Sequence, residues 1–93
     1  MSRDDEGREA VEQYLHDELP EASMESLDIP DGSGYLVRLA APDFDCDVIV
    51  ALEFVRDHDV GEIPEILEEW AVSDRVRAGG LVIITSSGVT TET

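Results

Sequence analysis

Every second residue is apolar along residues 44–55, which read FDCDVIVALEFV. On an extended chain successive side chains point to opposite faces, so every second residue of this stretch lies on one side. One of the two sides is wholly apolar, which predicts a strand that packs one face into the core. The other side begins with Asp45 and Asp47 and continues with Ile49, Ala51, Glu53 and Val55, three of which are apolar. We therefore expect this second face to be covered in part, by a helix or by another subunit.

Two segments have the spacing of an amphipathic helix. Within residues 4–19, apolar residues fall three and four positions apart, acidic residues suit the first turn, and Pro20 ends the segment. Within residues 63–78, an apolar stripe is followed by arginines in the last turn and by two glycines. The stripe consists of Ile63, Ile66, Leu67, Trp70 and Ala71. We expect one helix over each segment.

The remaining periodic segments predict strands. Leu27 and Ile29 form the short first arm of a hairpin, with its turn at residues 30–34 and its second arm at residues 35–39. Residues 81–86 predict a final strand. The predicted order is α-β-β-β-α-β, which indicates an α+β fold, a two-layer sandwich of two helices against a mixed or antiparallel four-stranded sheet. If the strands at 44–55 and 81–86 are parallel, the second helix is a right-handed crossover between them.

The chain shows no internal repeat or linker, so we expect one domain over residues 1–93, with frayed tails at residues 1–3 and 87–93. The N-terminal residues lack the apolar core of a signal peptide, and apolar runs such as VIVAL are far shorter than the roughly 20 residues that cross a bilayer. A single cysteine, Cys46, excludes an intramolecular disulfide and suits a reducing interior. We expect a cytoplasmic protein with no membrane partner.

The charge balance is strongly acidic. The chain has 23 Asp and Glu residues against six basic residues, all of them arginine, and its net charge is −17. At low ionic strength this charge opposes compaction, whereas at molar salt the Debye length falls to about 3 Å and the repulsion is nearly gone. The acidity and the absence of lysine resemble the composition of halophilic archaeal proteins, over the whole chain and without any family motif. So few basic residues predict no nucleic-acid surface.

Three aspartates, Asp43, Asp45 and Asp47, raise the question of a metal site. Ions that prefer oxygen need several carboxylates that converge on one point at about 2–2.6 Å. Alternate residues of a strand share a face, but they lie roughly 6–7 Å apart along it. The three carboxylates therefore predict a solvated strand face, and we expect no metal cofactor there.

The segment RDHDVGE, residues 56–62, joins the predicted strand to the second helix and carries four potential metal ligands. They are Asp57, His58, Asp59 and Glu62. Loops often carry functional residues, and a histidine can act as a metal ligand or as a general base. No serine lies in a nucleophile motif that would pair with this histidine. The simpler interpretation is a polar loop in which Asp59 or Glu62 caps the helix.

The scarcity of chemical features makes binding the leading hypothesis. We expect a small non-catalytic interaction or regulatory domain of a salt-rich cytosol, without a cofactor and without catalytic residues. Its contact with a protein or small-ligand partner is expected at Trp70, Ile49 and Val55, and apolar residues exposed on the second strand face predict a twofold homodimer. The alternative is a metal-binding or hydrolytic domain that uses the segment with Asp57, His58, Asp59 and Glu62.

Overall fold

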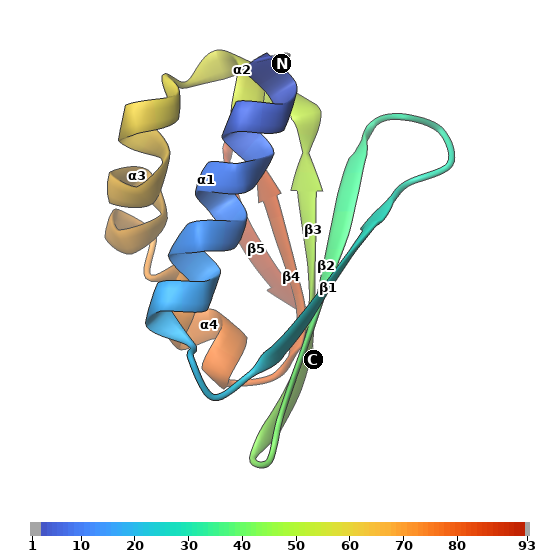
Figure 1. Ribbon diagram of the computed structural model, residues 1–93, viewed down its shortest axis with the longest axis vertical. Coiled ribbons are helices and arrows are strands. Elements are labelled where there is room, and N and C mark those ends of the chain that lie inside the picture. Colours follow the sequence, from blue (N-terminus) through green and yellow to red (C-terminus); the bar gives the residue numbers. More distant parts are fainter. Residues whose placement is uncertain (1–2, 93) are drawn as a thin grey trace.

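The computed structural model describes residues 3–92, and over this range the chain forms an α+β fold (Figure 1). Its helices are α1 (Arg3–Glu18), α2 (Leu52–Asp57), α3 (Ile63–Glu69) and α4 (Val72–Arg77), and the 3-10 turn η1 (Val60–Glu62) precedes α3. Its strands are β1 (Ser23–Asp28), β2 (Gly34–Ala41), β3 (Phe44–Ala51), β4 (Gly80–Thr85) and β5 (Gly88–Glu92). The predicted α+β class is confirmed, whereas the described residues form four α-helices and five strands where two and four were predicted.

The strands form one mixed sheet in the order β1-β2-β3-β4-β5. Strands β3 and β4 are parallel, and the other three neighbouring pairs are antiparallel. Strand β1 begins at Ser23, earlier than the predicted first arm at Leu27. Strand β5 covers most of the segment predicted as a frayed tail, because its valine and threonines suit an edge strand although they lack an apolar pattern. Residues 1, 2 and 93 of the predicted tails lie outside the described residues.

Strand β3 ends at Ala51, so the prediction of a strand over residues 44–55 is wrong for its last four residues. These residues begin helix α2 instead. Phe54 and Val55 are both 0 % exposed. Adjacent residues of a strand point to opposite faces, whereas adjacent residues of a helix can both face one core. Burying both side chains on the helix side of the sheet therefore requires a helical turn here.

The predicted helix over residues 63–78 is divided into α3 and α4 at Ala71. Ala71 has a left-handed backbone conformation, with φ 55° and ψ 39°. Leu67 and Val72 are both 0 % exposed although five positions separate them. In a continuous helix of 3.6 residues per turn, five positions correspond to a rotation of about 140° beyond a full turn, so the two side chains could not share one core. The break at Ala71 turns the chain between α3 and α4, so that Val72 can face the same core as Leu67.

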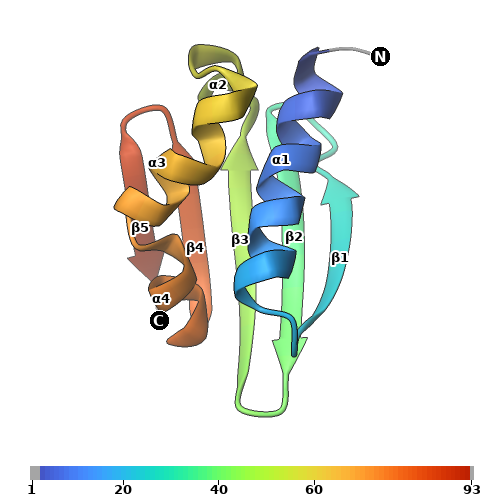
Figure 2. The same cartoon turned by 60° about the vertical axis from the view of Figure 1, so that its left-hand side comes forward.

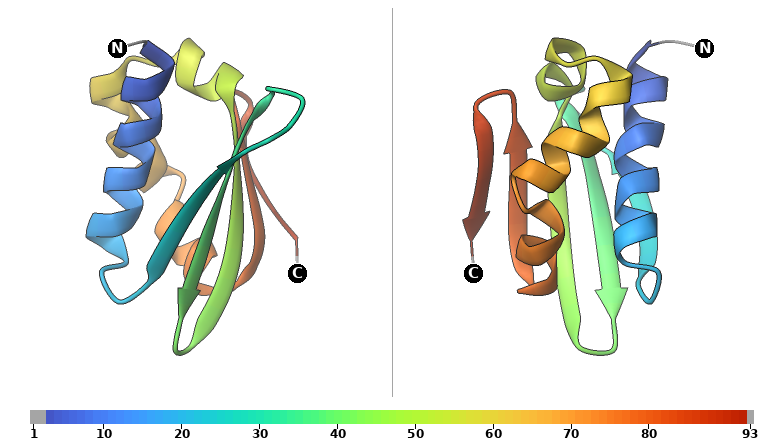
Figure 3. Two further views of the ribbon diagram at one scale, coloured as in Figure 1. Left: turned by 45° about the vertical axis from the view of Figure 1, so that its right-hand side comes forward. Right: turned by 90° about the vertical axis from the view of Figure 1, so that its left-hand side faces the viewer.

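All the described helices pack on one face of the sheet and leave the other face without a helical cover (Figures 2 and 3). The core lies between helices and sheet, and within the described part of the chain it contains no buried charged residue. The strands contribute Tyr35, Val37, Leu39, Phe44, Cys46, Val48, Val50, Val82 and Ile84 to it. The wholly apolar side predicted for β3 thus faces the helices. The expected cover on its second side is absent among the described helices.

Helices α1 and α2 approach each other closely at Gly7. A Cβ atom at this position would lie 2.1 Å from Cγ1 of Val55, which is closer than two carbon atoms can approach. Glycine is therefore required at the contact, and Val55 fills the space that a side chain would take.

The connection from β3 to β4 passes over the helix layer and is left-handed. With the helices toward the reader, β3 runs upward in Figure 2 and β4 lies to its left. This corrects the predicted right-handed crossover, which is the usual arrangement for parallel strands. Two features impose the unusual hand: β2 already occupies the other edge of β3, and the apolar side of β3 determines which face the helices cover.

Candidate functional site

The helix-free face of the sheet carries a continuous row of large apolar side chains. The register places Leu27 opposite Leu36, Leu36 opposite Ile49, and Ile49 opposite Ile83. Residues directly opposite each other on paired strands share a face. In β2, β3 and β4 the residues on either side of these positions are buried in the core, so the row itself points away from the helices. We call Leu27, Leu36, Ile49 and Ile83 the apolar row.

The apolar row is in contact with water. The side chain of Leu27 is 43 % exposed, and the other three members are half-buried by their neighbours. The view at the left of Figure 3 shows that no described helix lies over this side of the sheet, and the turn between β1 and β2 stands at its edge, where Ile29, Gly32 and Ser33 line a hollow together with Ile49. An apolar patch that crosses several strands and has a polar border is characteristic of a protein interaction site.

Charged residues border one side of the apolar row. In the next row of the register, Arg38 lies between Glu25 and Asp47, and the apolar Leu81 separates Asp47 from Glu92 at the β5 end. Asp45 is on the same face, two residues before Asp47 in β3. Arg38 Nε donates a hydrogen bond to Asp47 Oδ1 at 3.1 Å. The strands of the helix-free face thus carry four carboxylates and one arginine, a net charge of −3.

The structure separates the three residues that were predicted to contact a partner. Ile49 lies in the apolar row, whereas Val55 is buried in α2 and offers no contact surface. Trp70 lies half-buried on the helix side, at the end of α3, where its ring centroid is 5.5 Å from that of Phe54 and 6.3 Å from that of His58. Trp70 therefore belongs to an aromatic cluster remote from the apolar row.

Sequence reasoning found only one member of the apolar row. It missed Leu27, Leu36 and Ile83, although β2 and β4 also contain apolar residues that alternate with core positions. That alternation is the signal that could have found Leu36 and Ile83. Their alignment with Ile49 into one row depends on the strand register, which the sequence does not reveal.

The residues of the predicted alternative site, Asp57, His58, Asp59 and Glu62, do not converge. His58 Nδ1 lies 2.9 Å from the carbonyl oxygen of Phe54. The centroids of the His58 and Phe54 rings are 4.9 Å apart. Asp59 Oδ1 lies 4.0 Å from an Arg3 nitrogen. Asp59 and Glu62 occupy N-cap positions, but neither side chain bonds a backbone N–H, so the predicted cap is wrong. Within residues 3–92, no three histidine, cysteine or acidic residues lie close enough together to hold a metal ion.

The three aspartates around β3 have separate environments. Asp43 is exposed in the turn between β2 and β3, and Asp45 is exposed on the helix-free face. Asp47 shares that face and accepts the hydrogen bond from Arg38. The interpretation as a solvated strand face therefore agrees with the structure for Asp45 and Asp47, whereas Asp43 lies in the turn that precedes the strand.

Each of the six arginines joins two parts of the chain. The bonds are Arg3 to the His58 carbonyl, Arg8 to Glu12, Ser26 and Asp28, Arg38 to Asp47, Arg56 to Asp4, Arg75 to the Val89 carbonyl, and Arg77 to Glu21 and the Glu18 carbonyl. The Arg56 guanidinium makes two of these bonds with Asp4, at 3.2 and 2.9 Å, and lowers the pKa of that carboxyl group. The cations thus link elements instead of gathering into a positive patch.

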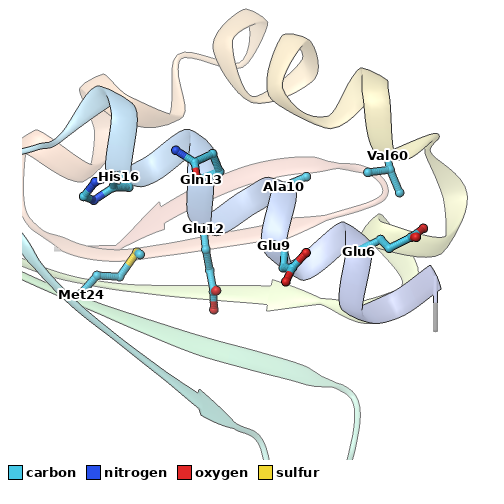
Figure 4. Close-up of a pocket in the computed structure, with 8 residues that line it drawn as sticks. All are labelled: Glu6, Glu9, Ala10, Glu12, Gln13, His16, Met24 and Val60. Carbon is cyan, nitrogen blue, oxygen red and sulfur yellow. The ribbon is translucent and has the colours of Figure 1, made fainter. Parts of the chain in front are cut away.

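A wide groove runs along α1, on the helix side of the molecule (Figure 4). It has a volume of about 870 Å³ and is lined by Glu6, Glu9, Ala10, Glu12, Gln13, His16, Met24 and Val60. Glu6 and His16 lie at opposite ends of it. At a rise of about 1.5 Å per residue, the carboxylates of Glu6 and Glu12 are spread over roughly 9 Å of helix, so they cannot share one cation. The groove has negative charge but no converging set of ligands.

Cys46 is buried on the core side of β3, 2 % exposed. Burial and, to a smaller extent, the charge of Asp47 raise the pKa of its thiol to about 11. The thiol therefore stays protonated near neutral pH and does not act as a nucleophile.

Comparisons with protein-family models, with curated proteins and with solved structures find no match for this chain. Among the described helices, none combines the length and the apolar character that crossing a bilayer requires. The apolar row and its charged border are therefore the observations from which a function must be inferred.

Proposed function

We propose that this protein is a non-catalytic interaction domain that pairs with a second copy of itself through the helix-free face. The apolar row carries the proposal, because it brings four large apolar side chains to a face that no described helix covers. Removing such side chains from water is favourable by about 25 cal/mol for each Å² of apolar surface buried, and this gain opposes the entropic cost of association.

A second copy is the occupant that we propose for this face, because two sheets of the same kind can pack against each other. Two sheets pack face to face about 10 Å apart, with their strands inclined by about 30°, and their inner side chains interdigitate. Ile49, on the central strand β3, has a member of the apolar row on either side, so a twofold axis near it would bring one row onto the other. The resulting assembly would have helices on its two outer surfaces and the two sheets between them.

The area of the face is of the order that a dimer interface needs. Five strands spaced about 4.8 Å apart, each about six residues long, present roughly 500 Å² of flat surface. The relief of the side chains raises the accessible area of such a face toward the roughly 800 Å² that each partner contributes to a standard interface.

The working environment that we propose is a salt-rich cytosol. The net charge of −17, with arginine as the only basic residue type, would oppose both folding and pairing at low ionic strength. At molar salt the Debye length of about 3 Å removes most of this repulsion, and the apolar row can then determine association.

Sedimentation equilibrium of about 50 µM protein in about 2 M KCl tests the proposal, since long-range charge repulsion is screened there. We expect a mass near twice the 10.2 kDa of one chain for the parent, and near 10.2 kDa for Ile49→Asp. Met24→Asp is the matched control: Met24 is 37 % exposed, but it lies in the groove on the helix side, so this variant should remain dimeric.

Circular dichroism of each variant separates loss of pairing from loss of folding. Should Ile49→Asp fail to fold, Leu27→Asp replaces it, because Leu27 is the most exposed member of the apolar row and its substitution disturbs little packing. A parent protein that sediments as one chain in high salt would contradict the proposal. A dimer that persists in folded Ile49→Asp and Leu27→Asp would contradict the assignment of the surface.

A further inference from the structure

We infer that pairing through the helix-free face is gated by ionic strength, and that the gate consists of Glu25, Asp45 and Glu92 at the border of the apolar row. This inference rests on the proposed function. It concerns the position of particular charges on the face and not the net charge of the chain.

Among residues 3–92, the three gate residues are the exposed carboxylates of this face that form no ion pair with an arginine. The fourth carboxylate, Asp47, is paired with Arg38 at 3.1 Å. The other five arginines are bonded elsewhere in the fold, in the α1, α2 and α4 regions. Glu25, Asp45 and Glu92 are exposed and lie on β1, β3 and β5, so that the charge is distributed across the whole width of the sheet.

The geometry of a paired sheet makes these charges decisive. Two facing sheets lie about 10 Å apart, so each copy brings a face of charge −3 to within about 10 Å of an identical one. This distance equals the Debye length at about 0.1 M salt, so the two faces repel each other there. It is about three times the Debye length at 1 M salt, so the repulsion between the faces is screened at that concentration. The attraction between the apolar rows persists across this range of salt concentration. Salt therefore changes the balance between apolar attraction and charge repulsion.

The test neutralises the gate without altering the apolar row. The variant carries Glu25→Gln, Asp45→Asn and Glu92→Gln, and leaves the Arg38 to Asp47 pair in place. For the parent we expect a dissociation constant at least about tenfold higher at 0.1 M than at 2 M KCl, because the border charges repel only when unscreened. For the gate variant we expect a clearly smaller change in the dissociation constant between the two salt concentrations than for the parent, because only the repulsion of the remaining charges is left to screen.

A control variant makes the same change in net charge on the opposite side of the molecule. It carries Glu9→Gln, Glu65→Gln and Glu69→Gln, three exposed residues on α1 and α3. It should retain the salt dependence of the parent. Equal effects of the two triple variants would show that overall charge, and not the border, governs pairing, and would overturn the inference.

The failures of the two proposals are distinguishable. A parent dimer with the same dissociation constant at 0.1 M and 2 M KCl overturns the gate but supports the proposed function. A parent and a gate variant that both stay monomeric at every salt concentration overturn the proposed function, and the gate falls with it.

Discussion

At the scale of single residues, two glycines mark the positions where the chain approaches itself too closely for a side chain. Gly34 begins β2, and a Cβ atom there would lie 2.1 Å from the backbone oxygen of Val50. At Gly7 the obstacle is a valine side chain, whereas at Gly34 it is the backbone of the central strand. A backbone atom cannot move aside without disturbing the sheet ladder.

Gly34→Ala should therefore lower the free energy of unfolding by about 3 kcal/mol, because the added methyl group forces β2 away from β3. Gly61→Ala is the control, since a Cβ atom at Gly61 meets no atom within 4 Å, and its effect should stay within about 0.5 kcal/mol. Urea denaturation in high salt measures both. Equal stabilities of the two variants would show that Gly34 is not a packing requirement.

Cys46 should be unreactive in the folded protein. Its thiol is buried, and a pKa of about 11 keeps it protonated at a pH of about 8, so the thiolate that attacks a disulfide reagent is scarce. We expect reaction with an aromatic disulfide reagent to be slower by at least about 100-fold than in the denatured protein. Absorbance of the released thiol follows both rates. Rapid labelling of the native protein would indicate that β3 opens readily.

At the scale of elements, the break between α3 and α4 depends on a left-handed alanine. Ala71 has φ 55°, a conformation that costs a residue with a Cβ atom about 1 kcal/mol and costs glycine little. The phase change that this residue introduces is required for the burial of Leu67 and Val72 in one core.

Ala71→Gly should consequently raise the free energy of unfolding by about 0.5–1 kcal/mol. Ala78→Gly is the matched control with the opposite sign: Ala78 has φ −74°, a right-handed conformation in which glycine has no advantage. It should lower the free energy of unfolding by about 0.5–1 kcal/mol. Chemical denaturation at constant salt compares the two. A loss of stability in Ala71→Gly would contradict the strain assigned to this position.

The elements also show how far the sequence could predict this structure. Alternation identified the first part of β3 correctly, and spacing identified α1. The boundary at Ala51 was missed because apolar residues continue from strand into helix without a glycine or proline between them. Strand β5 was missed because an edge strand buries too little to need an apolar pattern. The left hand of the crossover depends on two features together: the edge of β3 that β2 occupies and the side of β3 that is apolar. The sequence of one segment alone does not determine this combination.

The candidate site was predictable to the same limited extent. Ile49 could be assigned to a second apolar face from its position between core residues of β3. Val55 was assigned to the same face by extending the strand too far, and the helical turn of α2 places it in the core instead. A row that crosses strands is a property of the register, and local periodicity contains no information on register.

At the scale of the whole molecule, stability depends on the balance between 23 acidic residues and six arginines. The arginines are placed as links between elements, so each also lowers the local concentration of negative charge where two elements meet. The carboxylates in excess remain on the surface, where they repel one another.

The melting temperature should rise by about 5–15 °C between 0.1 M and 2 M KCl, because screening weakens the repulsion more than it weakens the few ion pairs. Replacing Glu9, Glu65 and Glu69 with glutamine should reduce this rise, since less repulsion remains to be screened. Differential scanning calorimetry measures both slopes. A melting temperature that does not change with salt would exclude salt adaptation as the reason for the acidity.

The aromatic cluster at the end of α3 provides an optical probe of this molecule. Trp70 is the single tryptophan of the chain, and its half-buried indole lies against Phe54 and His58 on the side opposite the apolar row. Its emission should shift to longer wavelength when the helix layer separates from the sheet, and should stay constant when two intact copies separate. Fluorescence can therefore distinguish denaturation from dissociation in one titration, without a label and without any substitution.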